Sequence, residues 1–357
     1  RDRLEKATGE YIGIEQGLLS AVGTERIICG SVQTVQKKKR LEKWAKDRFS
    51  LIVFDEAQHA PAATFRRPMD YFTNVKILGL TATPDRADKK AMGQIFDDCP
   101  EGCMYDVQEA IDDGYLVPYE CYAVHLDEID VSNITKSKGD LAVGQLDEAM
   151  AKAVEGVCSE TLARVGDRQA IIFLPGVKSA EYCAARFNAL LPGSAFMVSA
   201  KTNMDYRRQL FDEFRQGKYR FLVNVQIATE GTDLPSVGAV VQARPTLSRA
   251  LYAQMLGRGS RPQPGCVDPY EGPTMAEMRK DAIKRSRKQN CLVLDMVGNH
   301  GKHDLMTPVD ILGGDYTPAE VKTAKKLAKQ TDGEYNVHEL LEQAAKELAE
   351  KAAAVQA

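Results

Sequence analysis

Two adjacent carboxylates, Asp55 and Glu56, directly follow a short apolar run from Leu51 to Phe54. The run predicts a short buried strand, because all of its residues are apolar and two are β-branched. Ligands of open α/β sheets bind beyond the carboxyl ends of strands, where one carboxylate could hold hydrated Mg²⁺ and the other could activate a water. Acidic residues are also typical of a helix N-terminus. From these residues alone, both interpretations stay open.

A pair of threonines follows the next predicted strand, in the turn Thr81-Ala82-Thr83. Their hydroxyls can donate and accept hydrogen bonds, so they could respond to the state of a neighbouring acidic loop. On its own, such a turn is more typical of local structure than of a site.

The second half of the chain offers groups that suit a nucleotide. In the stretch from Ala228 to Pro235, Gly231 permits close approach of the backbone, and Asp233 with the neighbouring hydroxyls suits ribose and phosphate contacts. Arg258 and Arg261 then lie three residues apart in a glycine-containing segment after a predicted helix. Together they can clamp a transferring phosphoryl group, although each alone is more typical of a surface arginine.

Short apolar strands alternate with helical stretches, which is the pattern of an α/β protein. The predicted strands are 11–14, 27–30, 51–54, 75–80, 119–124, 170–174, 195–198, 221–225, 239–243 and 291–297. The predicted helices include 36–46, 179–191, 204–215 and 247–256, and the polar stretches 127–140 and 263–290 predict loops or surface excursions. We therefore predict a first domain at 1–118, a second at 119–312 and a helical C-terminal tail at 313–357, which begins with a capping box at Thr317 and Glu320.

The composition is that of an ordinary globular protein, with 44% hydrophobic and 27% charged residues. A net charge of −3 gives no general attraction to polyanions, so a nucleic-acid site has to be a local patch. The candidate patches are Lys37 to Arg40, which is more typical of a solvated helix start, and Arg279 to Lys288. Eight scattered cysteines without a Cys-x-x-Cys pair favour reduced thiols in the cytoplasm, and no apolar run is long enough to span a membrane.

In this order and spacing, these segments resemble the motor core of helicase superfamily 2. The closer resemblance is to bacterial and phage DEAD/DEAH-box proteins of the restriction-motor and excision-repair type, and it covers nearly the whole chain. In that family, two tandem RecA-like domains with parallel sheets bind ATP between them. The matching motifs are Ser31 to Thr34, Asp55 to His59 (motif II), Thr81 to Thr83 (motif III), Ile171 to Phe173 (motif IV), Ala228 to Pro235 (motif V) and Gln254 to Arg261 (motif VI).

The resemblance implies a role for each matching residue. Asp55 would hold Mg²⁺ through water, and Glu56 would be the general base that positions the attacking water. Arg258 and Arg261 would be arginine fingers on the γ-phosphate of ATP. The remaining roles are Gln254 near the same phosphate, Gly231 and Asp233 at the nucleotide, Gln58, His59, Thr81 and Thr83 in coupling, and Ser31, Gln33, Thr34, Thr202 and Thr229 at the nucleic-acid backbone.

One family feature is absent from the printed sequence. No Gly-x-x-x-x-Gly-Lys-Ser/Thr phosphate loop occurs in the 357 residues. The family places this loop, with its strand and helix, ahead of the first residue of this chain, so we expect a first domain that is truncated at its N-terminus. Because the loop is the main cradle of the β and γ phosphates, we expect the chain alone to hydrolyse ATP poorly or not at all.

The leading hypothesis is an ATP-dependent helicase or translocase, with DNA favoured over RNA by the group resemblance. One alternative is the motor portion of a restriction or repair complex, in which a nuclease or repair partner uses the movement. Another is a scaffold that binds nucleic acid without hydrolysing ATP. The joint presence of Glu56, Arg258 and Arg261 argues against the scaffold, which has no physical need for all three.

Overall fold

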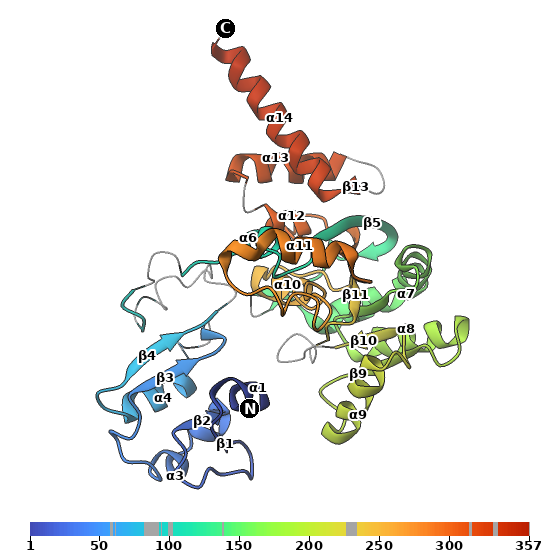
Figure 1. Cartoon of the computed structure of the whole chain (residues 1–357). Helices are drawn as coiled ribbons and strands as arrows, with labels where there is room; N and C mark the ends of the chain where they lie inside the picture. Colours follow the sequence, from blue (N-terminus) through green and yellow to red (C-terminus); the bar gives the residue numbers. More distant parts are fainter. Residues whose placement is uncertain are drawn as a thin grey trace. The chain divides into compact units, whose positions relative to one another are not determined.

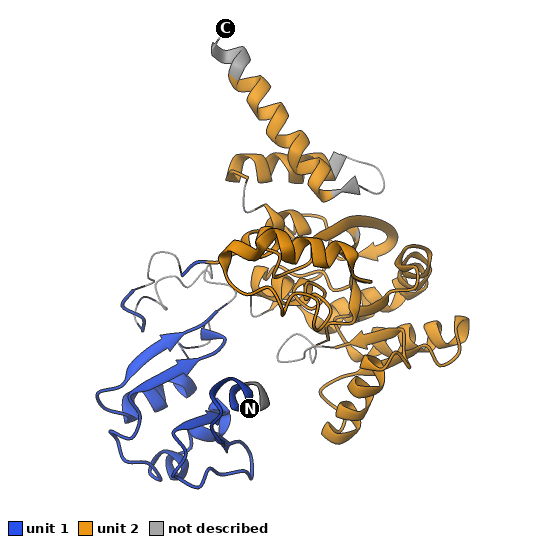
Figure 2. Ribbon diagram, viewed as in Figure 1, with its two compact units in different colours: residues 1–104 blue, residues 105–357 orange. Residues whose placement is uncertain are grey.

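The chain forms two compact units, Arg1–Met104 and Tyr105–Ala357 (Figures 1 and 2). The structure, a computed structural model, describes residues 1–357 except 58–59, 61, 82–92, 94, 99–102, 138, 226–233, 314–315, 331–334 and 357. The compact units divide between Met104 and Tyr105, whereas the sequence places a domain boundary at residue 118; the sequence domains stay a prediction.

The described residues of the first unit include two separate pairs of parallel strands. β1 (Ile12–Glu15) pairs with β2 (Ile27–Gly30), and β3 (Leu51–Phe54) pairs with β4 (Lys76–Gly79). These strands confirm the predicted ones to within one residue at each end. The helices described here are α1 (Asp2–Thr8), α2 (Val32–Val35), α3 (Lys38–Leu41) and α4 (Ala63–Tyr71). A small core forms around the buried residues Ala21, Leu41, Trp44 and Phe72.

The predicted helix at 36–46 is wrong. The structure has two one-turn helices, α2 and α3, and the backbone of Lys37 between them is extended, with φ −70° and ψ 131°. Nearby, the buried carboxylate of Glu15 accepts hydrogen bonds from Arg40 Nη1 at 2.7 Å and from Lys43 Nζ at 2.8 Å. Burial by itself raises the pKa of Glu15, but these bonds and one from Ser20 outweigh it and lower the pKa. The predicted basic patch thus loses Arg40 to an internal ion pair.

The second unit is organised around one sheet. Among the described residues, seven strands lie in the order β13-β5-β12-β11-β8-β10-β9, and all neighbours are parallel except β13 with β5. Their bounds are β5 (Tyr119–Asp130), β8 (Gln169–Phe173), β9 (Ala195–Val198), β10 (Phe221–Asn224), β11 (Val237–Gln242), β12 (Cys291–Asn299) and β13 (Tyr335–Asn336). The short strands β6 (Lys136–Ser137) and β7 (Asp140–Leu141) form an antiparallel pair apart from this sheet.

Helices cover both faces of the seven-stranded sheet. They are α6 (Val107–Asp112), α7 (Val143–Val165), α8 (Val177–Leu190), α9 (Met204–Arg215), α10 (Arg249–Leu256), α11 (Ala276–Arg285), α12 (Pro308–Leu312), α13 (Pro318–Gln330) and α14 (Val337–Gln356), with the short 3-10 helix η2 (Pro273–Met275). Successive residues of β8 belong to different cores: Ile172 packs with α7 and α8, and Ile171 packs with α9, α10 and α14. A parallel sheet is normally covered on both faces in this way.

Two predicted irregular stretches contain regular structure. The stretch 127–140 includes the end of β5, the whole of β6 and the start of β7, and the stretch 263–290 includes η2 and α11. The long helix α7 was not predicted. The capping box at Thr317 is confirmed, because its N–H donates to Glu320 Oε2 at 2.6 Å and the N–H of Glu320 donates to Thr317 Oγ1 at 3.3 Å.

The two tail helices α13 and α14 belong to the second unit by packing. Val337, Leu341 and Ala344 of α14 are buried in the core on the α10 face of the sheet, together with Ala324 of α13. Within the described ranges, no helix is both long enough and apolar enough to cross a membrane.

Candidate active site

Asp55 and Glu56 lie in a turn at the carboxyl end of β3. Asp55 is exposed, and its Oδ1 accepts the backbone N–H of Glu56 at 2.9 Å. Glu56 is half-buried and has a φ of +52°, in the left-handed region that residues other than glycine rarely adopt. Such a conformation costs on the order of 1–3 kcal/mol, and residues held in it cluster at functional sites. The backbone therefore marks Glu56 independently of its position after a strand.

Two backbone hydrogen bonds fasten this acidic turn to the end of β4. The N–H of Ala57 donates to the carbonyl of Leu80 at 2.8 Å, and the N–H of Leu80 donates to the carbonyl of Phe54 at 2.8 Å. Gly79 allows the close approach, because a Cβ at that position would lie 2.8 Å from the Cβ of Ala57. Thr81, the next residue after Leu80, therefore starts beside the acidic turn, as its predicted coupling role requires.

Several predicted site residues lie outside the described residues, so their roles stay predictions. They are Gln58, His59, Thr83, Thr229, Gly231 and Asp233. Within the part of the chain that the structure describes, no group of three or more His, Cys, Asp or Glu side chains could hold a metal ion. The role of Asp55 in holding Mg²⁺ through water stays a prediction.

Helix α10 orients Gln254 and Arg258 in the second unit. Ser248 caps its first turn, and Tyr252 and Met255 are buried, which leaves Gln254 and Arg258 half-buried. Helical hydrogen bonding continues past the helix end, since the N–H of Arg258 donates to the carbonyl of Met255 at 3.3 Å. Residues four apart lie on one side of a helix, so Gln254 and Arg258 are neighbours on this side.

The loop after α10 is packed tightly against the sheet. A Cβ at Gly259 would collide with Cys291 Sγ of β12 and would lie 2.8 Å from Val240 Cγ2 of β11. Only glycine therefore permits this approach of the loop to the strands. The next residue, Ser260, accepts the backbone N–H of Val117 at 2.8 Å through its carbonyl oxygen. These contacts fix the backbone directly before Arg261.

A buried lysine fixes the backbone of Arg261 itself. The side-chain Nζ of Lys288 donates to the carbonyl oxygen of Arg261 at 2.6 Å and to that of Pro235 at 3.0 Å. Lys288 is 6% exposed, and burial, together with the nearby charge of Arg261, lowers its pKa to about 8. The exposed side chain of Arg261 thus extends from a loop that Lys288 ties to the end of motif V.

The structure corrects the predicted basic patch from Arg279 to Lys288. Lys288 is buried as described, and Arg279 is also buried, with its Nε donating to the carbonyl of Asp113 at 2.7 Å. No feature of the sequence separates these two cations from their exposed neighbours, because charge alone does not reveal burial. The sequence therefore does not predict that Lys288 supports the loop from Gly257 to Arg261, which is called the arginine loop below.

The hydroxyl groups predicted to contact nucleic acid form hydrogen bonds within the first and second units. Ser31 Oγ donates to Thr34 Oγ1 at 2.9 Å, and the same oxygen of Thr34 accepts the N–H of Gly17 at 2.9 Å. Thr202 Oγ1 accepts the N–H of Ser199 at 3.0 Å. Thr34 is buried, whereas Gln33 is exposed. The nucleic-acid roles stay predictions for Ser31, Gln33, Thr34 and Thr202.

Two protein-family models match separate parts of the chain. The model described as "Type III restriction enzyme, res subunit" matches residues 4–86, which contain Asp55 and Glu56. The model described as "Helicase conserved C-terminal domain" matches residues 152–263, which contain Gln254, Arg258 and Arg261. Both groups of candidate residues thus lie within a matched family region.

Curated relatives share about a third of the aligned residues. The chain is 32% identical over 226 residues to a 51.5 kDa protein of a Lactococcus phage. This alignment covers 61% of this chain and 49% of the relative. It is 30% identical over 249 residues to the putative ATP-dependent helicase IRC3 of Saccharomyces cerevisiae. This alignment covers 66% of this chain and 35% of the relative. The chain therefore spans half or less of the length of these relatives.

A solved structure shares the fold. The fragment of a putative HsdR subunit of a type I restriction enzyme from Vibrio vulnificus superposes with a TM-score of 0.59 at 21% identity, covering 82% of this chain and 50% of that chain. With the large parallel sheet of the second unit, this likeness confirms the predicted α/β, RecA-like fold class.

Proposed function

We propose that this chain, which belongs to the superfamily 2 helicases of the restriction and repair type, is the ATP-driven motor part of a nucleic-acid helicase or translocase. In this proposal, Glu56 activates the attacking water, and Arg258 and Arg261 stabilise the charge that develops on the transferring phosphoryl group. Gln254 supports the same phosphate from α10.

The observation that supports this proposal best is the fixed loop that bears Arg261. Charge stabilisation in a transition state requires donors that are held in place before the reaction. Gly259 packs on the strands, Ser260 is bonded to Val117, and Arg261 is bonded to Lys288. These contacts act on the backbone, so they hold the position from which the Arg261 side chain extends.

The residues present fit part of a site for ATP and Mg²⁺. The exposed carboxylate of Asp55 is the type of oxygen ligand that Mg²⁺ prefers when it keeps most of its waters. Bound ATP with Mg²⁺ would supply the phosphoryl group and its charge neutralisation. The printed sequence offers no phosphate loop, which is the usual cradle of the β and γ phosphates. We therefore propose that the 357-residue chain alone turns over ATP poorly or not at all.

We propose DNA as the nucleic acid on which this motor acts. The support is the match to a restriction-enzyme family over residues 4–86 and the fold shared with a restriction-enzyme subunit. The same matches favour a motor that serves a separate nuclease or repair partner. Contacts through hydroxyl and amide groups such as those of Ser31 and Gln33 suit a strand that is held without reading its bases.

The test is ATP turnover by the native polypeptide that contains these residues, measured with and without single-stranded DNA, duplex DNA or RNA. We expect stimulation by DNA that exceeds stimulation by RNA. Turnover that no nucleic acid stimulates would contradict the motor and would favour the non-hydrolysing scaffold. Stronger stimulation by RNA would leave the motor and overturn its assignment to DNA.

A further inference from the structure

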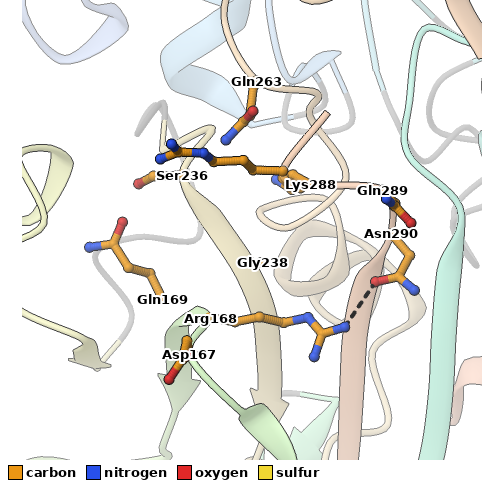
Figure 3. Close-up of a pocket in the computed structure, with 10 residues that line it drawn as sticks. Asp167, Arg168, Gln169, Ser236, Gly238, Gln263, Lys288, Gln289 and Asn290 are labelled. Atoms are coloured by element: carbon orange, nitrogen blue, oxygen red, sulfur yellow. Dashed lines mark hydrogen bonds between the residues drawn. The ribbon is translucent and has the colours of Figure 1, made fainter. Parts of the chain in front are cut away.

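The second unit contains a polar cavity of about 430 Å³ at the starts of three neighbouring strands (Figure 3). It lies where β8, β11 and β12 begin, at the edge of the sheet opposite to their carboxyl ends. Residues before β8, around the start of β11 and before β12 line it together with Gln263 of the segment after Arg261. The lining residues that matter here are Asp167, Arg168, Ser236, Gly238, Arg287 and Lys288.

Glycine and a strand irregularity shape the floor of this cavity. The register between β11 and β8 shifts between Val237 and Ala239, so Gly238 lies at a bulge. A Cβ at Gly238 would lie 3.3 Å from Cγ of Arg168, which shows that the stem of Arg168 lies across the bare backbone. The guanidinium of Arg168 then donates to Asn290 Oδ1 at 3.3 Å, as the dashed line in Figure 3 shows.

The cavity lining has more cations than carboxylates, although Asn290 of the lining also donates to the carboxylate of Glu120 at 3.0 Å. Arg168, Arg287 and Lys288 line it, against the single carboxylate of Asp167, and among the described residues none of the three cations forms a salt bridge. Other cations of this unit are paired with acids, for example Lys178 with Glu148, Arg186 with Glu155 and Lys218 with Glu213. In a chain of net charge −3, these three cations make the cavity a local positive patch.

A buried hydroxyl adds a second signal. Ser236 Oγ is shielded from solvent and has no hydrogen-bond partner within the part of the chain that the structure describes. Buried polar atoms are normally bonded, so the wall around Ser236 lacks one polar partner, which a ligand in the cavity could supply after rotation of the Ser236 side chain. Amide groups of Gln263, Gln289 and Asn290 complete a lining that is polar rather than apolar.

We propose that this cavity is a binding site for an oxyanion of the phosphate class. Planar guanidinium groups match the oxygens of a phosphate, and the ammonium of Lys288 adds charge from the wall. The phosphate belongs either to a small polyphosphate, such as pyrophosphate or a nucleotide, or to the backbone of a bound strand. Because Lys288 also holds the carbonyl of Arg261, an anion here would act on the ammonium that supports the arginine loop.

The test is calorimetric titration of the 357-residue chain with inorganic pyrophosphate. We expect saturable binding at one site per chain, weakened by about tenfold or more in Arg168→Gln and in Arg287→Gln, since each removes a charged hydrogen-bond donor. Arg208→Gln, which replaces an exposed arginine of α9 that does not line the cavity, is the control and should bind as the unaltered chain does. Circular dichroism of each variant establishes that it is folded; Arg287 is exposed, so its replacement leaves the fold intact.

Three results would overturn the proposal. They are the absence of saturable binding, equal binding in all the variants, and loss of binding in Arg261→Gln alone, which would place the anion at the arginine loop. A competing oligothymidylate that displaces pyrophosphate would identify the strand as the source of the phosphate, and competition by ADP alone would identify a small polyphosphate. The assay needs no ATP turnover, so failure of the proposed motor leaves its outcome unchanged.

Discussion

The two parallel sheets that bear the candidate residues differ in how they are covered. In the second unit, every residue of β10 and β11 is buried, because α7 and α8 lie on one face and α9, α10 and α14 on the other. In the first unit, one face of the β3–β4 pair is bare: Leu51, Val53, Leu78 and Leu80 are 51%, 50%, 46% and 50% exposed. The opposite face, with Ile52 and Phe54, is covered.

The two sheets therefore hold their candidate residues in different ways. The sheet of the second unit can hold Gln254, Arg258 and Arg261 rigidly, because both of its faces contribute buried apolar area. The β3–β4 pair holds Asp55 and Glu56 mainly through its pairing, the hydrogen bonds to Leu80 and one packed face. Bare apolar faces of parallel sheets are uncommon in isolated domains and mark places where another layer packs. We therefore expect changes in the two sheets to have very different effects.

The largest expected effect concerns a buried acid in the second unit. Burial raises the pKa of Asp295 on β12 to about 7, the hydroxyl of Tyr252 partly offsets this, and the carboxylate of Asp310 adds to it. A carboxyl whose pKa is raised on folding stabilises the protein below its unfolded value of 3.8 and loses this contribution as pH rises to about 7. Asp295→Asn should remove this loss and raise the free energy of unfolding by on the order of 4 kcal/mol at alkaline pH.

The measurement for Asp295 is urea denaturation at several pH values. The gain from Asp295→Asn should be near zero around pH 4, grow up to about pH 7 and then stay constant. Asp55→Asn, at the exposed end of β3, is the matched control and should change stability by less than about 0.5 kcal/mol. A gain from Asp295→Asn that is independent of pH would contradict the raised pKa.

A matched leucine pair compares the two sheets directly. Leu222→Ala on β10 should lower the free energy of unfolding by about 3 kcal/mol, because it leaves a cavity in a fully buried core. Leu78→Ala on β4 should cost less than about 1 kcal/mol, because this side chain is half exposed. Circular dichroism follows the whole chain, and the fluorescence of Trp44, the single tryptophan, follows the first unit. Equal losses for both substitutions would refute the contrast between the sheets.

Lys288→Met tests whether the second unit presets the arginine loop. Loss of the two carbonyl bonds should lower the kcat of nucleic-acid-stimulated ATP turnover by about tenfold, since small displacements of a catalytic group have effects of this size or larger. The KM for ATP should change little. Hydrogen exchange of the amides from Gly259 to Gln263 should accelerate in the same variant, whereas Lys322→Met, an exposed control on α13, should leave both unchanged. Unchanged exchange in Lys288→Met would show that this lysine does not hold the loop.

The smallest expected effect is on the bare face of the first unit. Replacing Leu51 and Val53 by threonine keeps the strand propensity and should change stability by less than about 1 kcal/mol. The same change should reduce binding of anilinonaphthalene sulfonate and self-association, because it removes half of the exposed apolar patch. Met204→Thr, a single exposed residue elsewhere, should reduce neither. Dye binding that persists would show that this face is not the accessible patch.

The sequence predicts the strands better than it predicts the environment of charges. The strands at 27–30 and 51–54 and the helix at 204–215 are found with the predicted ends, because their hydrophobic patterns are local. The helix at 36–46 fails, because the backbone of Lys37 is extended and separates α2 from α3, while Arg40 and Lys43 bond to the carboxylate of Glu15. The missed helix α7 does have a buried stripe, in which Leu146, Met150 and Val157 recur at helical spacing.

For the candidate site too, the sequence predicts some residues but not the contacts that position them. Motif order identifies Asp55, Glu56, Arg258 and Arg261, because the spacing of residue types is a property of the sequence. The support by Lys288 and the left-handed backbone of Glu56 are set by tertiary contacts and turn geometry, so the sequence alone does not reveal them.

The measurement that tests the central claim most directly is the kcat for ATP turnover of the native polypeptide with saturating DNA, compared between Glu56→Gln and Arg261→Gln. Glu56 belongs to the first unit and Arg261 to the second. We predict that each substitution lowers the kcat by a factor of about 100 or more, while both variants still bind DNA. Full turnover in Glu56→Gln would contradict the assignment of the general base. Full turnover in Arg261→Gln would contradict the role of Arg261 in phosphoryl transfer and therefore the proposed motor.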